Sequence, residues 1–237
     1  MQNRHWNPLE QLSLDQLRRR TSQTWSAHSS DVLSLWVAEM DVPLAPAVTN
    51  ALHHAVDIGD TGCASRHGYA EAVAGFASTR WDSPDLPITH IRVLPDMMAG
   101  IIEVLRASTE PGDSVIVTTP VYAPFFSYIS HADRMIVEAP LAPTGRLDID
   151  SIGNTIARVQ ASGRWCVVQL CTPHNPTGTV HTRSELESLA RVARDAGIRV
   201  LSDEIHGPLV LPGAPFIPYF TVANSENAIA STSASKG

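Results

Sequence analysis

Residues 198–206, Ile-Arg-Val-Leu-Ser-Asp-Glu-Ile-His, decide the fold, because they join an apolar run to a strongly polar turn. The run from Ile198 to Ser202 is short and mostly apolar, which is typical of a strand buried in a parallel sheet. Asp203 follows directly, where that strand would end. Ligands of open α/β sheets bind beyond the carboxyl ends of the strands, so Asp203 is a candidate for a binding or catalytic role.

The rest of the chain alternates between strand-like and helix-like segments. Strands are expected at 33–38, 91–94, 115–118, 135–138, 165–171, 198–202 and 229–232. Helices are expected at 70–81, 96–108, 123–131, 149–160 and 183–196, after a helix that begins at Pro46 and a short one opened by a Ser13-x-x-Gln16 capping box. Strands that alternate with helices of about 10 to 15 residues indicate βαβ units. The sequence therefore predicts an α/β fold in which helices cover both faces of a mostly parallel sheet.

Composition narrows the class of protein. The chain has 237 residues, of which 43% are hydrophobic and 17% charged, enough for one large domain or two small ones. A net charge of -7 without a long basic run argues against nucleic acid or an anionic membrane surface as the main partner. No apolar run reaches the roughly 18 residues of a membrane span. The start of the chain has no signal-peptide core, so we expect a cytoplasmic protein.

The three cysteines suggest neither a disulfide nor a metal site. Cys63, Cys166 and Cys171 are odd in number and lack the spacing of a zinc site. Cys166 and Cys171 fall inside one strand-like run, where a thiol usually acts as a small hydrophobic group. We therefore expect all three to be free thiols.

Two more polar segments follow predicted strands. Residues 172–178 are Thr-Pro-His-Asn-Pro-Thr-Gly, and residues 231–237 are Ser-Thr-Ser-Ala-Ser-Lys-Gly. Asn175, Asp203 and Lys236 thus each lie after a strand, and this set is typical of a pyridoxal-phosphate site. That cofactor needs an amine to hold it, an anion at its ring nitrogen, a donor at its phenolic oxygen and a cradle for its phosphate. Ordinary interpretations stay open: a solvated Lys, a helix-capping Asp and a simple Asn-Pro turn.

These segments resemble the fold-type I pyridoxal-phosphate enzymes, the class I/II aminotransferase family. Asp-Glu-Ile-His at 203–206 and Pro-His-Asn-Pro-Thr-Gly at 173–178 look like the cystathionine β-lyase branch, the C-S lyases of MalY/PatB type. The resemblance begins at about residue 9 and runs to the end. It implies the three-layer large domain of that family, with pyridoxal 5'-phosphate as the cofactor.

The resemblance also implies roles for individual residues. Lys236 would hold the cofactor covalently and later act as the base that removes the α-proton. Asp203 would pair with the ring nitrogen, and Asn175 and His206 would donate to the phenolic oxygen. Tyr122 would stack on the cofactor ring. A structural role for His206 and a plain core or rim position for Tyr122 are the open alternatives.

A helix N-terminus is the expected phosphate site. The backbone N–H groups of Met97 and Met98, in the helix opened by Asp96, would bind the phosphate, and Ser233 and Ser235 would add hydroxyl groups. The alternative is a simple Asp96 N-cap with two core methionines.

Two further segments take their expected properties from the resemblance. Residues 36–41, Trp-Val-Ala-Glu-Met-Asp, are similar to a family segment on the substrate side of the site, which assigns substrate binding to Trp36 and Ala38. The family also suggests cis peptide bonds at Thr119-Pro120 and Asn175-Pro176.

Two departures from the family pattern stand out. Cys63 occupies a position where the family commonly has a Tyr that reaches the phosphate of the neighbouring subunit, and Tyr69 lies nearby as a substitute. The chain also stops one residue after Lys236, whereas the family continues with a last strand of the sheet and a small C-terminal domain. We therefore expect an N-terminal arm with the start of the domain junction at 1–45, and an incomplete cofactor-binding large domain at 46–237.

The preferred interpretation is a β-lyase that converts cystathionine or cysteine S-conjugates to pyruvate, ammonia and a thiol. An aminotransferase would use the same residues and is the first alternative. An inactive fragment or a regulatory binding protein is the second, which the truncation and Cys63 favour. Family members are dimers, so we expect a homodimer of the intact protein, with a small amino-acid thioether as substrate and no metal.

Overall fold

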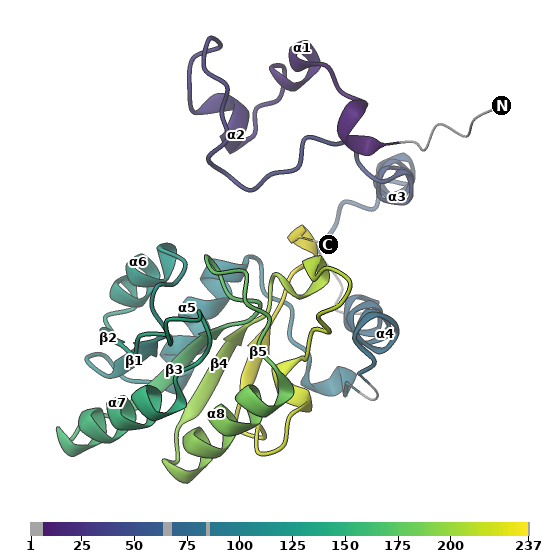
Figure 1. Ribbon diagram of the computed structural model, residues 1–237. Helices are drawn as coiled ribbons and strands as arrows, with labels where there is room; N and C mark the ends of the chain where they lie inside the picture. The colour runs from purple at the N-terminus through teal and green to yellow at the C-terminus, as the bar shows by residue number, and fades with distance from the viewer. Residues whose placement is uncertain (1–6, 64–67, 84–85, 237) are drawn as a thin grey trace. The chain divides into compact units, whose positions relative to one another are not determined.

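The computed structural model describes residues 7–63, 68–83 and 86–236, and the chain forms two compact units, 1–64 and 65–237 (Figure 1). The first unit holds four short or medium elements: η1 Pro8–Glu10, α1 Leu14–Leu17, α2 Gln23–Ser26 and α3 Pro46–Asp57. The predicted capping box opens α1. The amide of Gln16 donates to Ser13 Oγ at 3.3 Å, and the amide of Ser13 donates to Gln16 Oε1 at 2.8 Å.

The strand expected at 33–38 is wrong. These residues form bends and irregular backbone, and Leu35 is 85% exposed. An alternating apolar pattern makes a strand only where a neighbour offers a hydrogen-bonded ladder, and the described residues of this unit contain no other strand. Side chains hold the region instead: Trp25 Nε1 donates to Asp41 Oδ1 at 2.8 Å, and Arg20 donates to the Val42 carbonyl at 2.8 Å.

The second unit is built on a five-stranded parallel sheet (Figure 1). Its strands are β1 Ser114–Val117, β2 Met135–Glu138, β3 Cys166–Cys171, β4 Arg199–Asp203 and β5 Ile229–Ser231, in the order β2-β1-β3-β4-β5. Every residue of β1 and β3 is buried. A strand covered on both faces needs apolar side chains in both directions, and this explains the continuous apolar runs in the sequence.

Helices cover both faces of the sheet, as predicted. The elements around it are α4 Tyr69–Trp81, η2 Ile88–His90, α5 Met97–Ser108, α6 Pro124–His131, α7 Ile149–Ala161, α8 Arg183–Asp195, η3 Gly207–Leu209, η4 Tyr219–Thr221 and η5 Ala234–Lys236. Buried residues of α7 and α8 share one core with Ile116 and Val168, while those of α5 and α6 share another with Val115 and Val117. The neighbouring residues of β1 therefore point into different cores.

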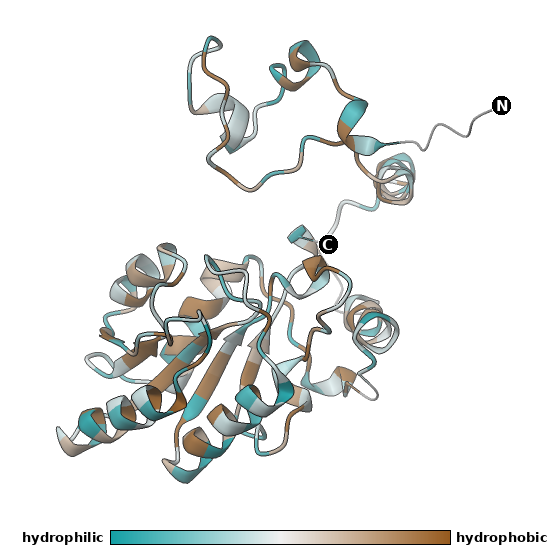
Figure 2. Cartoon of the chain, viewed as in Figure 1, coloured by the Kyte–Doolittle hydropathy of each residue, from teal (hydrophilic) through white to brown (hydrophobic). Residues whose placement is uncertain are grey.

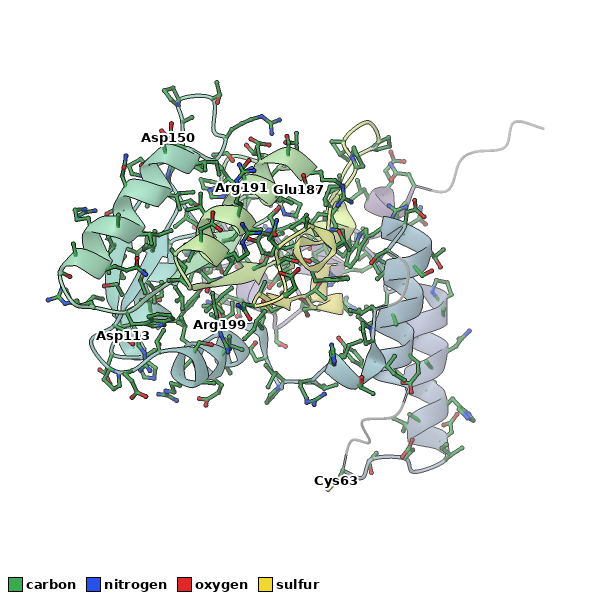
Figure 3. The ribbon with its side chains drawn as sticks, turned by 90° about the horizontal axis from the view of Figure 1, so that it is seen from below. Cys63, Asp113, Asp150, Glu187, Arg191 and Arg199 are labelled. Carbon is green, nitrogen blue, oxygen red and sulfur yellow. The ribbon has the colours of Figure 1, made fainter. Side chains whose placement is uncertain are left out.

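The helices that cover the sheet carry both hydrophobic and hydrophilic residues (Figure 2). Leu186 and Leu189 of α8 are fully buried against the sheet, whereas Arg191, labelled in Figure 3, is exposed. A capping box opens α8, because the Glu185 amide donates to Thr182 Oγ1 at 3.3 Å and the Thr182 amide donates to Glu185 Oε2 at 2.7 Å. In the part of the chain that the structure describes, no helix is both long and apolar enough to cross a bilayer.

The strand expected at 91–94 is also wrong. Its backbone is irregular, and within the described ranges it has no partner strand. Besides the short α1, six helices were expected. Each of them lies within two residues of the predicted bounds or begins at the predicted residue. The five remaining strands lie within one residue of their predicted bounds. The three cysteines are free; Cys166 and Cys171 are buried, as their place in a strand-like run predicted, and Cys63 is exposed.

Candidate active site

The three strands that precede the candidate residues end at the same level of the sheet. Cys171 of β3 pairs with Asp203 of β4, and Asp203 pairs with Ser231 of β5. The turns that follow β3, β4 and β5 contain Asn175, His206 and Lys236, respectively. The topology therefore gathers these turns at one edge of the sheet, where ligands of such sheets bind.

Asp203 is a buried carboxylate, 6% exposed, and the last residue of β4, which lies between β3 and β5. Its Oδ1 accepts a hydrogen bond from the Ile205 amide at 3.1 Å. Burial raises the pKa of the carboxyl to about 6, and the Ile205 amide opposes this rise. Among the residues that the structure describes, no cation contributes to this shift, so the carboxylate is suited to a positively charged ligand atom.

The turn after β3 is attached to the turn after β4. The Thr172 amide donates to the Asp203 carbonyl at 2.9 Å, and the Pro173 carbonyl faces the ring of His206. The backbone N–H of Asn175 donates to Cys171 Sγ at 3.4 Å. The cis bonds predicted at Thr119-Pro120 and Asn175-Pro176 are confirmed, and Thr172-Pro173 is cis as well.

His174 attaches the same turn to the one after β1. Its ring is 2% exposed, and Nε2 lies 2.8 Å from the Pro120 carbonyl oxygen. Tyr122 follows Pro120 by two residues and is 39% exposed, with its ring edge-on to Phe125 at a centroid distance of 6.0 Å. The structure thus brings Tyr122 to the same edge of the sheet, while its stacking on a cofactor stays a prediction.

Lys236 ends η5, close to His206. The pKa of His206 is lowered mainly by burial and then by the charge of Lys236, while the Pro173 carbonyl raises it. Ser233 and Ser235 lie in the same turn, and their hydroxyl oxygens are 3.1 Å apart. Lys236 is also the only lysine of the chain. Within these 237 residues, a covalent bond between a cofactor and a lysine can therefore form only there.

At the expected phosphate site, a carboxylate of the chain itself accepts hydrogen bonds from the first amides of the helix. Asp96 caps α5, and its Oδ1 accepts from the amides of Met98 at 2.8 Å and Ala99 at 3.0 Å. Met97 and Met98 are partly buried against the core shared by α5 and α6. Asp96 therefore acts as the N-cap of α5, as the alternative interpretation expected. Phosphate binding by Met97 and Met98 stays a prediction, and it requires the Asp96 carboxylate to share or release the backbone amide of Met98.

Other predicted residues lie in the first unit. Trp36 is 55% exposed and packs edge-on against His28, with ring centroids 6.1 Å apart. Ala38 and Cys63 are exposed as well, and Cys63 is labelled in Figure 3. Their assigned roles stay predictions, as does the domain division at 45/46. Gly237 and residues 64–67, which follow Cys63, lie outside the described residues.

Sequence reasoning gave no role to three buried residues beside these turns. Glu204 is 2% exposed, and His174 makes the contact to Pro120 described above. Tyr128 is 3% exposed, and its hydroxyl has no hydrogen-bond partner among the described residues. Burial and then the nearby Asp203 raise the Tyr128 pKa. A glutamate directly after an apolar strand is the signal that could have identified Glu204, because a buried carboxyl requires partners.

Comparisons with known proteins agree with this geometry. The family model described as Aminotransferase class I and II matches residues 30–237. A protein of Mycobacterium leprae (strain TN) named "Putative cystathionine beta-lyase" is 51% identical over 235 residues, which are 98% of this chain and 58% of the relative. Cystathionine beta-lyase PatB of Bacillus subtilis (strain 168) is 30% identical over 82% of this chain and 50% of that protein.

A solved structure gives the same result for the fold. The crystal structure of cystalysin from Treponema denticola contains a pyridoxal 5'-phosphate cofactor and matches with a TM-score of 0.81 at 26% identity. The match covers 92% of this chain and 58% of that chain. This chain therefore spans between half and three fifths of the length of the relatives it matches.

Proposed function

Because this chain belongs to the aminotransferase class I and II family, we propose that the protein is a pyridoxal-phosphate-dependent carbon–sulfur β-lyase. Its substrates would be cystathionine or other cysteine S-conjugates, and its products pyruvate, ammonia and a thiol. The observation that supports this most is the gathering of Asn175, Asp203 and Lys236 on three adjacent strand-end turns. The 51% identical relative named as a cystathionine β-lyase favours the lyase over other chemistries.

The residues present fit pyridoxal 5'-phosphate. Asp203 is a buried carboxylate whose pKa is lowered by no cation of the described part of the chain, which suits a protonated pyridine nitrogen. Lys236 supplies the only ε-amine of the chain. Asn175 and His206 lie on the two turns next to Asp203, where they would donate to the phenolic oxygen. Tyr122 would cover a ring face, and Ser233, Ser235 and the start of α5 would hold the phosphate.

The chain's own residues would divide the proton transfers among them. When bound, the cofactor supplies an electron sink for the charge that develops at the substrate Cα. Lys236 Nζ would accept the α-proton. The Asp203 carboxylate would keep the proton on the ring nitrogen. Trp36 and Ala38 would line the substrate side.

Carbon–sulfur cleavage would then balance as a β-elimination. The Cα–H bond breaks and its proton goes to Lys236 Nζ, while the Cβ–S bond breaks and the sulfur leaves with the electron pair. The resulting 2-aminoacrylate takes up water to give pyruvate and ammonia, so no external oxidant or second substrate is needed. Lys236 can also return its proton to the leaving thiolate.

Two assignments go with this proposal. We propose a homodimer in which the surroundings of Cys63 approach the phosphate of the neighbouring subunit, where a thiol would be a poorer donor than the tyrosine of the family. We also propose a cytoplasmic location, where free amino-acid thioethers would be available as substrates.

An aminotransferase is the second candidate, since the family description itself names that activity. It would use Lys236 and Asp203 in the same way, but the proton taken from Cα would be returned to the cofactor carbon. The two activities differ in their need for an acceptor. A lyase forms pyruvate without any keto acid, whereas an aminotransferase requires one.

The test uses the 237-residue chain with added pyridoxal phosphate. Borohydride reduction followed by intact-mass measurement should give one adduct on the wild-type chain and none on Lys236→Arg. Pyruvate formation from L-cystathionine without a keto acid would then support the lyase. An adduct with turnover only in the presence of a keto acid would favour the aminotransferase. Absence of the adduct would contradict both and leave the inactive or regulatory protein.

A further inference from the structure

Glu204 joins three parts of the site through its own hydrogen bonds. Its carboxyl Oε1 accepts from Ser202 Oγ at 2.9 Å and from the Tyr219 amide at 2.7 Å. Its amide donates to the Ser231 carbonyl at 2.8 Å, and its carbonyl accepts from Thr232 Oγ1 at 3.4 Å. One residue thus connects the end of β4, the end of β5 and the segment at η4.

Among the described residues, no cation faces the Glu204 carboxyl. The residue is 2% exposed. The titratable groups that face it are Asp203 at the end of β4 and Tyr219 on η4. Ser231 at the end of β5 and Thr232 after it contact the backbone of Glu204 and are not titratable. Burial raises the pKa of Glu204 to about 8; its two hydrogen bonds oppose the rise, and the Asp203 charge adds to it.

We propose that Glu204 is a positioning residue that acts as a neutral acid: it fixes the turn with Asp203 and His206 to the strand that leads to Lys236. This role rests on the proposed function, in which Asp203 must be ionised at the cofactor nitrogen. Two adjacent buried carboxylates without a cation cannot both ionise at low cost. A neutral Glu204 lets Asp203 carry the single negative charge of the pair.

Neutrality also fits the geometry of the bonds. A protonated carboxyl still accepts through its carbonyl oxygen, so Oε1 can keep the bonds from Ser202 and Tyr219. A glutamine has the same shape and acceptor but never ionises. Glu204→Gln should therefore preserve the positioning role, whereas Glu204→Ala removes the acceptor and leaves the Tyr219 amide buried without a partner.

The experiment compares Glu204→Gln and Glu204→Ala with the exposed control Glu226→Gln in the 237-residue chain. The first readout is the pyridoxal-phosphate dissociation constant between pH 6.5 and 9.5. At pH 7 we expect Glu204→Gln and Glu226→Gln to stay within about twofold of the wild type, and Glu204→Ala to bind about tenfold more weakly, the size of one lost hydrogen bond. Wild-type affinity should fall above about pH 8, and that of Glu204→Gln should not.

The second readout needs no cofactor. Carboxyl ¹³C NMR of the cofactor-free chain should show Glu204 titrating near pH 8 and Asp203 near pH 6. The Asp203 signal should also shift a second time as Glu204 ionises, and this step should be missing in Glu204→Gln. If the wild type bound no cofactor, the proposed function would fail, and the titration would still decide the charge of Glu204. A Glu204 signal that titrates in the ordinary acidic range, or a Glu204→Gln chain as weak as Glu204→Ala, would overturn the inference.

Discussion

The backbone amide of Thr172 donates to the carbonyl of Asp203 at 2.9 Å, and this bond holds the turn after β3 against the end of β4. The Pro173 carbonyl next to it faces the ring of His206 and raises the pKa of that ring. His174 does the same between the turns after β3 and β1, with Nε2 2.8 Å from the Pro120 oxygen. Glu204 and Thr232 extend the series to β5. The candidate site is therefore a row of turns, each hydrogen-bonded to the next.

The contact between His206 and Pro173 gives a first prediction. His206→Phe keeps a flat ring but removes the ring N–H groups that could donate to the Pro173 carbonyl or to the cofactor, so cofactor affinity should fall by about tenfold. His206→Asn retains an N–H donor and should lose less. Titration of the chain with pyridoxal phosphate measures both, with His131→Phe at the exposed end of α6 as control. Equal cofactor affinities for all three variants would show that the contact between His206 and Pro173 does not position the site.

Asp203 should show opposite effects on stability and on activity. Its pKa is about 6 in the folded chain against 3.8 for a free side chain, so the folded state is penalised once the pH rises above 3.8, and the penalty is complete above about 6. Asp203→Asn should therefore stabilise the cofactor-free chain at pH 8 by about 1 to 3 kcal/mol and not at pH 3.5.

The same substitution removes the anion that we propose at the ring nitrogen of the cofactor, so pyruvate formation should fall by about 100-fold or more. Thermal unfolding at the two pH values and the pyruvate assay test the two effects separately. Asp203→Asn with full activity would exclude the proposed role. A lower stability of this variant at pH 8 would contradict the origin of the pKa shift in burial.

His181 should make the fold sensitive to acid. The residue is 1% exposed, and neither ring nitrogen has a hydrogen-bond partner among the described residues. Burial is the main cause that lowers its pKa to about 4 from 6.5, so the folded chain binds fewer protons than the unfolded chain in this range. Stability from this group is present above pH 6.5 and is lost as the pH falls towards 4.

His181→Leu should therefore be more stable than the wild type at pH 5, with a smaller difference at pH 7.5. Urea unfolding at the two pH values measures this, and the exposed His53→Gln serves as control. An acid sensitivity unchanged by His181→Leu would assign the effect to other groups.

The three thiols should differ in reactivity. Cys63 is exposed, whereas burial raises the pKa of Cys166 to about 11 and that of Cys171 to about 12, with the Asp203 charge adding to the second shift. The thiolate is the reactive form. Iodoacetamide should thus add one group to the native chain, none to native Cys63→Ser and three to the wild type in denaturant, as read by intact mass.

Gly207 lies where the backbone closely approaches an aromatic cluster. A Cβ at this position would lie 2.9 Å from Phe216 Cε1 and 3.1 Å from Trp81 Cζ2, and Trp81 also packs edge-on against Phe216 and Phe76. Gly207→Ala should destabilise the chain by about 1 to 3 kcal/mol.

Gly153 is the matched control, because a Cβ there would lie 3.7 Å from Val192 Cγ1, an ordinary contact in the middle of α7. Gly153→Ala should raise stability by about 0.5 to 1 kcal/mol through helix propensity. Urea unfolding followed by tryptophan fluorescence compares the two variants. Equal stabilities would mean that the aromatic cluster yields to the added methyl group.

Much of the fold was predictable because its signals are local. Asp148 and Thr182 cap α7 and α8 within two residues of the expected starts. The strands at 33–38 and 91–94 were wrong because a strand also needs a partner, which a local pattern does not supply. The remaining five strands lie beside one another, and their apolar runs matched that burial.

The site was predictable to a different extent. Parallel strands bring their carboxyl ends to one edge, so Asn175, Asp203 and Lys236 could be expected to gather from their positions in the sequence. The bonds from His174 to Pro120 and from Glu204 to Tyr219 span 54 and 15 residues. They depend on which turns become neighbours, and neither residue's own segment indicates its partner.

The order of the site residues along the chain has a consequence for biosynthesis. Tyr122, Asn175 and Asp203 all precede Lys236, and Asp203 closes β4 before β5 is made. At roughly 5 to 20 residues per second, the ribosome adds the last stretch from Asp203 to Lys236 in about 2 to 7 seconds. During that interval the nascent chain has the residues proposed to stack on the ring and to pair with its nitrogen, but it has no lysine. Under the proposed function, covalent attachment of the cofactor therefore follows the synthesis of all three of these earlier residues.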